Sequence, residues 1–234
     1  MPLRPDSFET PDPSPPPFPL TDVDRAVLAM SDDEFQPHTW EELKQIIAEH
    51  DLSVLKRRPS DLRRYQAWSA DIKARYGSVP NFVMAERLQW SPLPSSAPDA
   101  KPEFAVKNPV PFADPDDYKI LLNDWPYGLA PGIGHLIVWL KTRLESEPTR
   151  GDMTPESRQQ VEEFIQKTFV DRIKDLPGEP EKIMWFRNWT ALQSVPGLEH
   201  VHVLVRDVPE DIVREWTDGV PPLHEEVAQF QHQR

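Results

Sequence analysis

The pattern of hydrophobic and polar positions changes along the chain, from helical spacing in the first part to strand-like runs in the second. Short runs of β-branched and other apolar residues are typical of strands. They predict strands at residues 118–122, 135–140, 182–188 and 198–205. Between the second and third strands, Thr154 is a helix N-cap residue and Pro155 suits the first helical position. A helix is therefore predicted from Thr154 to about Ile173.

Helical spacing dominates residues 21–90. The segment Thr39-Trp40-Glu41-Glu42 is a capping box, and apolar residues at helical spacing follow it. A second helix is predicted to open at Ser60, and Gly77 stands where a C-terminal glycine cap belongs. A short helix is also predicted over residues 209–216, after the last strand.

Proline-rich stretches divide the chain. Prolines are dense in residues 1–20 and again in residues 91–117, which predicts a disordered arm and then a long loop or linker. Residues 118–217 then carry the order strand–strand–helix–strand–strand, and residues 218–234 form a tail. This order predicts an α+β fold with an antiparallel sheet and a crossing helix, preceded by an N-terminal helical portion.

The composition excludes several classes of function. The net charge of −13 argues against a nucleic-acid backbone or an anionic membrane as the main partner, although a small phosphorylated ligand needs only a local pocket. The chain has no cysteine, which excludes disulfides and thiolate chemistry and fits a cytoplasmic or nuclear protein. No apolar run is long enough for a membrane helix, and the N-terminus lacks the apolar core of a secretory signal.

The strongest chemical signal is the pair His200 and His202 in the last predicted strand. Side chains alternate across a strand, so both imidazoles should lie on one face about 7 Å apart. Two groups that titrate near neutral pH suit phosphoryl chemistry, proton transfer or a metal. A metal would need further ligands, and His135 is a candidate for the third. Glu199 should point to the opposite face of the strand, which makes it a poor fourth ligand. No metal and no cofactor are therefore expected. The simpler alternative is a hydrogen-bonded histidine pair on a half-polar strand.

Several segments together resemble the histidine-triad superfamily of nucleotide hydrolases and transferases. The similarity covers about residues 118–206, and the segment order and the intervening helix both match. The matching positions are Asn123-Asp124-Trp125-Pro126, the strand 131–138 with His135, then Asn188, Gln193-Ser194-Val195 and His200-Val201-His202.

The resemblance implies roles for these residues. His200 would be the nucleophile that attacks phosphorus, and His202 would donate to a phosphate oxygen. Asn188 and Ser194, with Gln193 beside them, would contact the phosphate, Asn123 would take the ribose-binding position, and His135 is a further candidate for ligand binding. Leu198 stands at the position of the first histidine of the superfamily motif. This departure leaves open a protein that kept the fold and lost the chemistry.

The whole chain is also similar to a narrower family, the fungal N-acetylglucosamine-induced proteins, over about residues 35–217. The segments that carry the similarity are 40–43, 58–62, 76–78, 123–128, 135–141 and 186–195. This similarity implies a link to the response to an amino sugar.

These observations predict a protein that binds a nucleotide or nucleotide sugar, with phosphohydrolase or nucleotidyl-transferase activity as the chemistry to test. The alternative is a non-catalytic regulatory or interaction protein. The expected partner is a small phosphorylated ligand, with no nucleic acid and no membrane, and a homodimer is possible by analogy. Lys141 and Arg187 are the nearest cations that could meet a phosphate.

Overall fold

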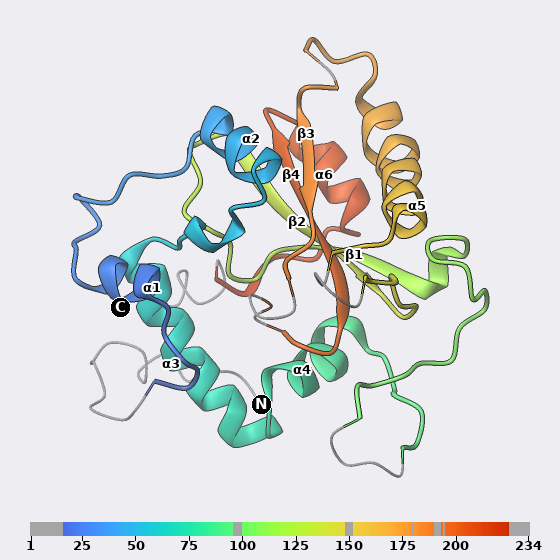
Figure 1. Ribbon diagram of the computed structural model, residues 1–234, viewed down its shortest axis with the longest axis horizontal. Coiled ribbons are helices and arrows are strands. Elements are labelled where there is room, and N and C mark those ends of the chain that lie inside the picture. The colour runs from blue at the N-terminus through green and yellow to red at the C-terminus, as the bar shows by residue number, and fades with distance from the viewer. Residues whose placement is uncertain are drawn as a thin grey trace. The chain divides into compact units, whose positions relative to one another are not determined.

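The chain folds into two compact units in the computed structural model, and both units are made of discontinuous segments (Figure 1). The structure describes residues 16–95, 100–147, 152–178, 180–189, 193 and 195–224. The first unit, called here the helical unit, comprises Met1–Phe82, Asn123–Pro131 and Pro221–Arg234. The second, the sheet unit, comprises Val83–Leu122 and Gly132–Val220.

The sheet unit is built on four antiparallel strands in the order β1-β2-β4-β3. The strands are β1 (Tyr118–Leu122), β2 (Ile133–Leu140), β3 (Ile183–Phe186) and β4 (Glu199–Arg206). All four predicted strands are present, although β2 begins two residues earlier and β3 ends two residues earlier than predicted. The α+β class is therefore confirmed.

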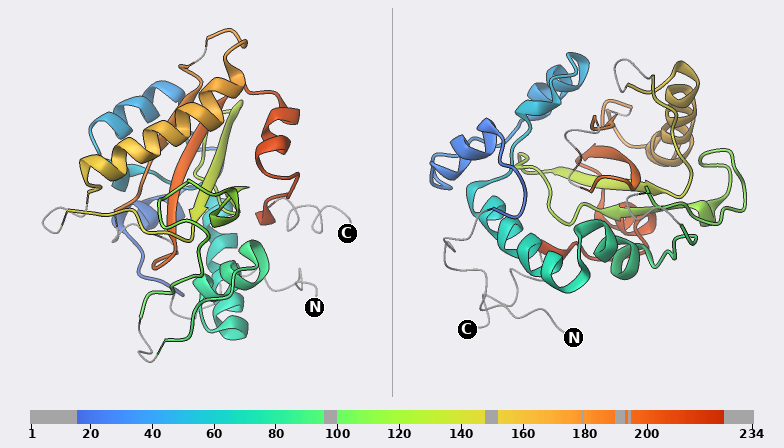
Figure 2. Two further views of the ribbon diagram at one scale, coloured as in Figure 1. Left: turned by 90° about the vertical axis from the view of Figure 1, so that its right-hand side faces the viewer. Right: turned by 60° about the horizontal axis from the view of Figure 1, so that its bottom comes forward.

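Two helices pack on one face of this sheet. They are α5 (Pro155–Ile165), which crosses the strands in the left view of Figure 2, and α6 (Glu210–Trp216). The Thr154 hydroxyl accepts a hydrogen bond from the backbone of Ser157, as expected of an N-cap residue. The predicted helix does reach Ile173, but it continues beyond α5 as a π-helical turn, Gln166–Val170, and a 3₁₀ turn, Asp171–Ile173.

Alternation along β4 separates an apolar face from a histidine face. Val201, Val203 and Val205 lie in the core that α5 and α6 cover, together with the fully buried Phe169. Because side chains alternate across a strand, His200 and His202 lie on the opposite face. The three valines thus bury one side of the strand and orient the imidazoles on the other.

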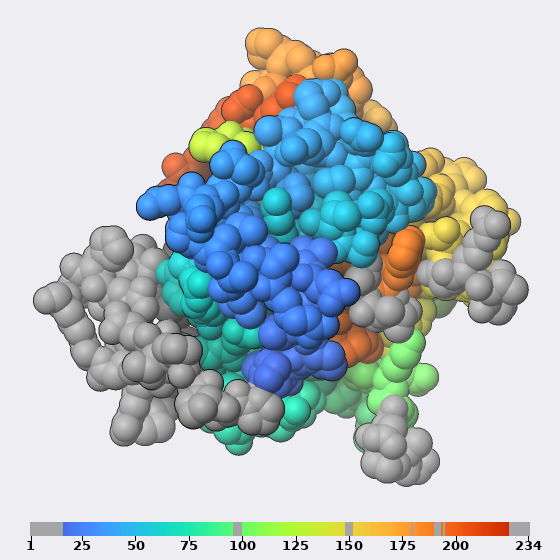
Figure 3. All heavy atoms as spheres, turned by 60° about the vertical axis from the view of Figure 1, so that its left-hand side comes forward, coloured from blue at the N-terminus to red at the C-terminus, as the bar shows by residue number. Residues whose placement is uncertain are grey.

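The helical unit contains α1 (Asp22–Leu28), α2 (Trp40–Ala48), a 3₁₀ turn at Leu52–Val54, α3 (Pro59–Tyr76) and α4 (Val79–Phe82). The blue and cyan atoms in Figure 3 show its first segments gathered on one surface. The remaining short helices, a π-helical turn at Val83–Leu88 and a 3₁₀ turn at Pro115–Asp117, belong to the sheet unit. Among the described residues, no helix has the length and apolar character needed to span a bilayer.

The predicted start of α3 at Ser60 is one residue late. The helix begins at Pro59, after the N-cap residue Arg58, because proline fits the first helical position. Ser60 instead donates its backbone N–H and its hydroxyl to Asp32, at 2.9 and 2.6 Å. Gly77 ends the helix with φ of +79°, which confirms the predicted glycine cap.

The capping box at the start of α2 leads to a stability prediction. The Thr39 hydroxyl accepts from the Glu42 backbone at 3.2 Å, and the Glu42 carboxylate accepts from the Thr39 backbone at 2.8 Å. Thr39→Ala removes one cap acceptor and should lower the free energy of unfolding by about 1 kcal/mol, measured by urea denaturation. Thr39→Ser, which keeps the hydroxyl, is the control, and equal losses in both variants would contradict this role of the cap.

Candidate functional site

The register between β2 and β4 brings three histidines onto one face of the sheet. Trp139 pairs with His200, Ile137 with His202 and His135 with Leu204. Paired residues of antiparallel strands point to the same side, so His135 joins the predicted pair. All three residues are nearly buried, with exposed fractions of 4%, 4% and 6% for His135, His200 and His202. We call these residues, together with Asn188, the histidine cluster.

His200 is held in a defined orientation. Its Nδ1 lies 2.8 Å from the carbonyl oxygen of Leu198, and its ring lies against Trp139 with 4.8 Å between ring centroids. A carbonyl oxygen can only accept, so Nδ1 carries the hydrogen and Nε2 carries the lone pair. Burial lowers the pKa of His200, an effect that the hydrogen bond to Leu198 and the Glu199 charge partly oppose. The imidazole is therefore neutral at neutral pH, with a lone pair available on Nε2.

His202 lies at the centre of a chain of hydrogen bonds. Its Nδ1 is 2.9 Å from Nε2 of His135, and its Nε2 is 3.1 Å from Nδ2 of Asn188. With the Asn188 amide as donor to Nε2, Nδ1 of His202 must donate to His135, which fixes the tautomer of both rings. The ring of Phe186 stacks parallel on His202, with 4.7 Å between centroids. These contacts fix the orientation of His202.

Five of the seven predicted site residues belong to the sheet unit and are connected by these contacts or the strand register. They are His135, His200, His202, Asn188 and Gln193. The side-chain amide of Gln193 donates to the backbone carbonyl oxygen of Asn188 at 3.1 Å. Ser194 lies outside the described residues. Asn123 belongs to the helical unit, where its side-chain oxygen accepts from the Trp125 backbone at 3.0 Å and shapes a turn. Its ribose-binding role stays a prediction.

Strand register supplies contacts that sequence reasoning missed. His135 meets His202 because β2 and β4 pair antiparallel, and Phe186 meets His202 because the two are register partners in β3 and β4. The sequence carries no local signal for either contact. The alternation of residues in each strand gives the face, but only the register gives the neighbour.

The two candidate cations are engaged by carboxylates. Arg187 donates to Glu199 at 2.8 Å, and Lys141 lies 3.6 Å from Asp117. Asp117 also accepts from the backbone N–H groups of Lys107 and Asn108, each at 2.8 Å. Both cations thus tie neighbouring segments of the sheet unit together. In the part of the chain that the structure describes, no group of three or more histidine or acidic side chains is placed to hold a metal ion.

The lowered pKa of His200 predicts how stability depends on pH. The unfolded histidine titrates near its ordinary value of 6.5, whereas the folded one resists protonation. The contribution of His200 is therefore fully present above about pH 6.5, and it is lost as the pH falls from there toward the lowered pKa. The buried His38, whose pKa burial also lowers, acts in the same direction.

Urea unfolding between about pH 7.5 and about pH 5.5 should show this loss, since the ordinary carboxyl pKa values lie below that window. His200→Asn, which cannot be protonated, should reduce the slope, and His38→Asn provides the matched comparison in the helical unit. An unchanged slope in His200→Asn would contradict the assignment.

Comparison with known proteins places the chain in a family. A family model described as "Protein of unknown function (DUF3605)" matches residues 39–206, which include all the described residues of the histidine cluster. The chain belongs to this family. The predicted similarity to fungal N-acetylglucosamine-induced proteins is thereby confirmed, since one relative carries that name.

The relatives are similar over most of their length. N-acetylglucosamine-induced protein 1 of Candida albicans is 28% identical over 191 residues, which cover 78% of this chain and 74% of that protein. The uncharacterized protein YPL067C of Saccharomyces cerevisiae is 28% identical over 173 residues, covering 74% of this chain and 81% of the relative. A solved structure titled "Crystal Structure of HTC1" matches with a TM-score of 0.57 and 26% identity, over 80% of this chain and 96% of that one.

Proposed function

We propose that the sheet unit binds a nucleotide or nucleotide sugar at the histidine cluster, and that His200 acts as a nucleophile toward phosphorus. The observation that carries the proposal is the orientation of His200. Its Nδ1–H is donated to the Leu198 carbonyl, so that the lone pair is on Nε2, and burial keeps the ring neutral. A neutral imidazole with a fixed lone pair is a competent nucleophile at neutral pH.

The likeness to the histidine-triad superfamily supports the same proposal. Four antiparallel strands with a crossing helix between the second and third follow the segment order of that superfamily. Leu198 stands at the first histidine position of the motif, but His135 of β2 supplies a third imidazole by bonding to His202. His135 and Asn188 engage both ring nitrogens of His202, so His202 is held in place by its neighbours, and the side-chain amide of Asn188, which carries a second N–H, is the proposed donor to a phosphate oxygen.

The proposed reaction is a double displacement. Nε2 of His200 attacks the α-phosphorus of the nucleotide, the N–P bond forms, and the P–O bond to the leaving phosphate or sugar phosphate breaks. The ring becomes positively charged, and the hydrogen bond from Nδ1 to the Leu198 carbonyl stabilises this charge. Water or an acceptor hydroxyl then attacks the phosphorus, the N–P bond breaks, its proton passes to the solvent, and His200 returns to the neutral form.

The Candida relative suggests which nucleotides to test first. Its name links that protein to induction by N-acetylglucosamine, and the activated form of this sugar is a nucleotide sugar. UDP-N-acetylglucosamine is therefore the first probe. A cytoplasmic or nuclear location agrees with such a ligand, and location and homodimer formation both remain predictions.

A second candidate function is a non-catalytic regulatory or interaction protein. Two observations favour it: the three histidines are nearly buried, and Leu198 stands at the first histidine position of the superfamily motif. In that case the hydrogen bonds of the cluster would serve to stabilise the sheet.

Ligand binding tests the proposal. A thermal-shift panel of nucleoside mono-, di- and triphosphates and nucleotide sugars, with the unphosphorylated nucleosides as controls, should identify a nucleotide that binds. At 100 times Kd the ligand adds about 2.7 kcal/mol to the apparent stability, a shift of a few degrees. The nucleotide should then perturb the imidazole NMR signals of His135, His200 and His202 and leave those of His38 and His50 unchanged. No shift with any nucleotide would refute the proposal.

A further inference from the structure

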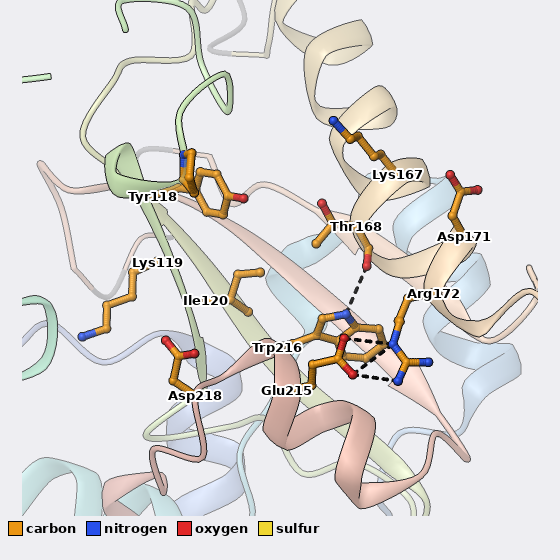
Figure 4. Close-up of a pocket in the computed structure, with 11 residues that line it drawn as sticks. Tyr118, Lys119, Ile120, Lys167, Thr168, Asp171, Arg172, Glu215, Trp216 and Asp218 are labelled. Carbon is orange, nitrogen blue, oxygen red and sulfur yellow. Dashed lines mark hydrogen bonds and ion pairs between the residues drawn. The ribbon is translucent and has the colours of Figure 1, made fainter. Parts of the chain in front are cut away.

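A pocket of about 540 Å³ lies in the sheet unit, apart from the histidine cluster (Figure 4). Its lining comes from β1 and the 3₁₀ turn before it, from the π-helical and 3₁₀ turns that follow α5, and from α6 and the turn after it. Ile120 of β1 lines it, and this residue lies in the core under α5 and α6. The histidines are on the opposite face of the sheet, so the pocket is a separate site.

The walls of the pocket are held together by hydrogen bonds between the segments that form them. The indole N–H of Trp216 donates to the backbone carbonyl of Thr168 at 3.0 Å, at the π-helical turn where the regular α-helical bonding ends. Arg172 forms a bidentate ion pair with Glu215, with its shortest contact at 2.6 Å. Both links join the segment after α5 to α6. π-Helical turns of this kind are frequent at functional sites, because the break in bonding frees backbone groups for other contacts.

Most of the charged groups in the lining are already engaged. Arg172 and Glu215 neutralise each other, Asp171 accepts from Gln166 at 2.8 Å, and Lys119 donates to the Arg87 carbonyl at 3.0 Å. These contacts fix four of the six charged side chains around the pocket.

Lys167 and Asp218 are different, because neither side chain makes a hydrogen bond or an ion pair with any residue that the structure describes. Figure 4 shows them at opposite ends of the pocket, with Ile120 and Trp216 between them. Asp218 follows α6 in a left-handed turn, with φ of +52°, and Gly219 follows with φ of +68°. The pocket thus offers a cation at one end, an anion at the other and an apolar floor between.

We propose that this pocket binds a small amphoteric molecule, with its acidic group at Lys167 and its ammonium group at Asp218. The volume fits a ligand of modest size, and a ligand with both charges meets one complementary group at each end. Two kinds of small molecule carry this chemistry: amino acids with their short peptides, and amino-sugar phosphates.

Calorimetric titration of the full-length protein separates the two sources. The probes are the dipeptide leucyl-glycine and glucosamine 6-phosphate, and one of them should bind. Each probe is paired with two analogues that lack one charge. The methyl ester of the dipeptide and glucosamine lack the acidic group. The N-acetyl form of the dipeptide and N-acetylglucosamine 6-phosphate lack the ammonium group. Loss of either charge from the bound probe should weaken binding about tenfold.

Matched variants assign the two ends of the pocket. Lys167→Met should weaken binding of the complete probe about tenfold and leave binding of the analogue without the acid unchanged. Asp218→Asn, in which asparagine tolerates the left-handed turn, should also weaken binding of the complete probe about tenfold. It should leave binding of the analogue without the ammonium group unchanged. The double variant Lys174→Met/Asp175→Asn, which changes exposed charges of the same segment outside the pocket, and His200→Asn should bind as the natural protein does.

Three results of these titrations would overturn the proposal. Absence of binding for both probes at millimolar concentration, or unchanged binding in both pocket variants, would refute it. So would a dependence on Lys167 alone, because the site would then bind a simple anion. The pocket and the histidine cluster lie on opposite faces of the sheet. If the histidine cluster failed as a nucleotide site, the titrations of this pocket would still test the present proposal.

Discussion

His200→Asn should reduce turnover of a nucleotide substrate by about a thousandfold or more, because it removes the nucleophilic Nε2. The substitution is chosen so that the side-chain amide can still donate to the Leu198 carbonyl, which accepts from Nδ1 at 2.8 Å in the natural protein. The free energy of unfolding should therefore change by no more than about 1 kcal/mol. Steady-state turnover and urea unfolding, measured on the same preparation, test the two halves of this expectation.

The matched control is His38→Asn, which alters a buried histidine of the helical unit whose Nε2 accepts from the Lys56 backbone at 3.3 Å. This variant should keep its turnover. Loss of stability in His200→Asn with turnover unchanged would favour the non-catalytic alternative, because His200 would then be a structural residue.

The largest effect on stability is expected from the ion pair between Arg187 and Glu199. The two side chains are 10% and 7% exposed, and their nearest atoms are 2.8 Å apart. Arg187 also donates to the Ser146 hydroxyl at 2.8 Å. Arg187→Met leaves the Glu199 carboxylate buried without its cation, which should lower the free energy of unfolding by about 3–5 kcal/mol. Urea denaturation near neutral pH measures this loss.

Two controls separate the effect of an unpaired charge from the loss of an ion pair. The double variant Arg187→Met/Glu199→Leu replaces both charges with apolar groups and should be more stable than Arg187→Met alone. Arg214→Met breaks the exposed pair with Glu210, whose members are 70% and 81% exposed, and should change stability by no more than about 1 kcal/mol. Equal losses in the buried and exposed variants would contradict the burial argument.

The sequence predicted the elements because their signals are local. The valines around His200 and His202 indicate a strand, and Thr154 with Pro155 marks the start of α5. The two faces of β4 also follow from alternation alone. These features depend on residues that are close together in the chain.

Contacts between distant segments could not be predicted in the same way. His135 and His202 are 67 residues apart, and their 2.9 Å contact depends on the register of β2 against β4. The stacking of Phe186 on His202 depends on a second register. Residues 123–131 belong to the helical unit although they lie between β1 and β2 in the chain, an arrangement that no boundary drawn along the sequence expresses.

The covalent intermediate tests the central claim most directly. The protein is mixed with UDP-N-acetylglucosamine, or with the nucleotide that binds best in the panel, quenched in alkali to preserve a phosphoramidate, and analysed by intact mass and peptide mapping. A nucleotidyl group is expected on the peptide that contains His200, and none in His200→Asn. A nucleotide that binds and is turned over without labelling His200, or a label on another histidine, would contradict it.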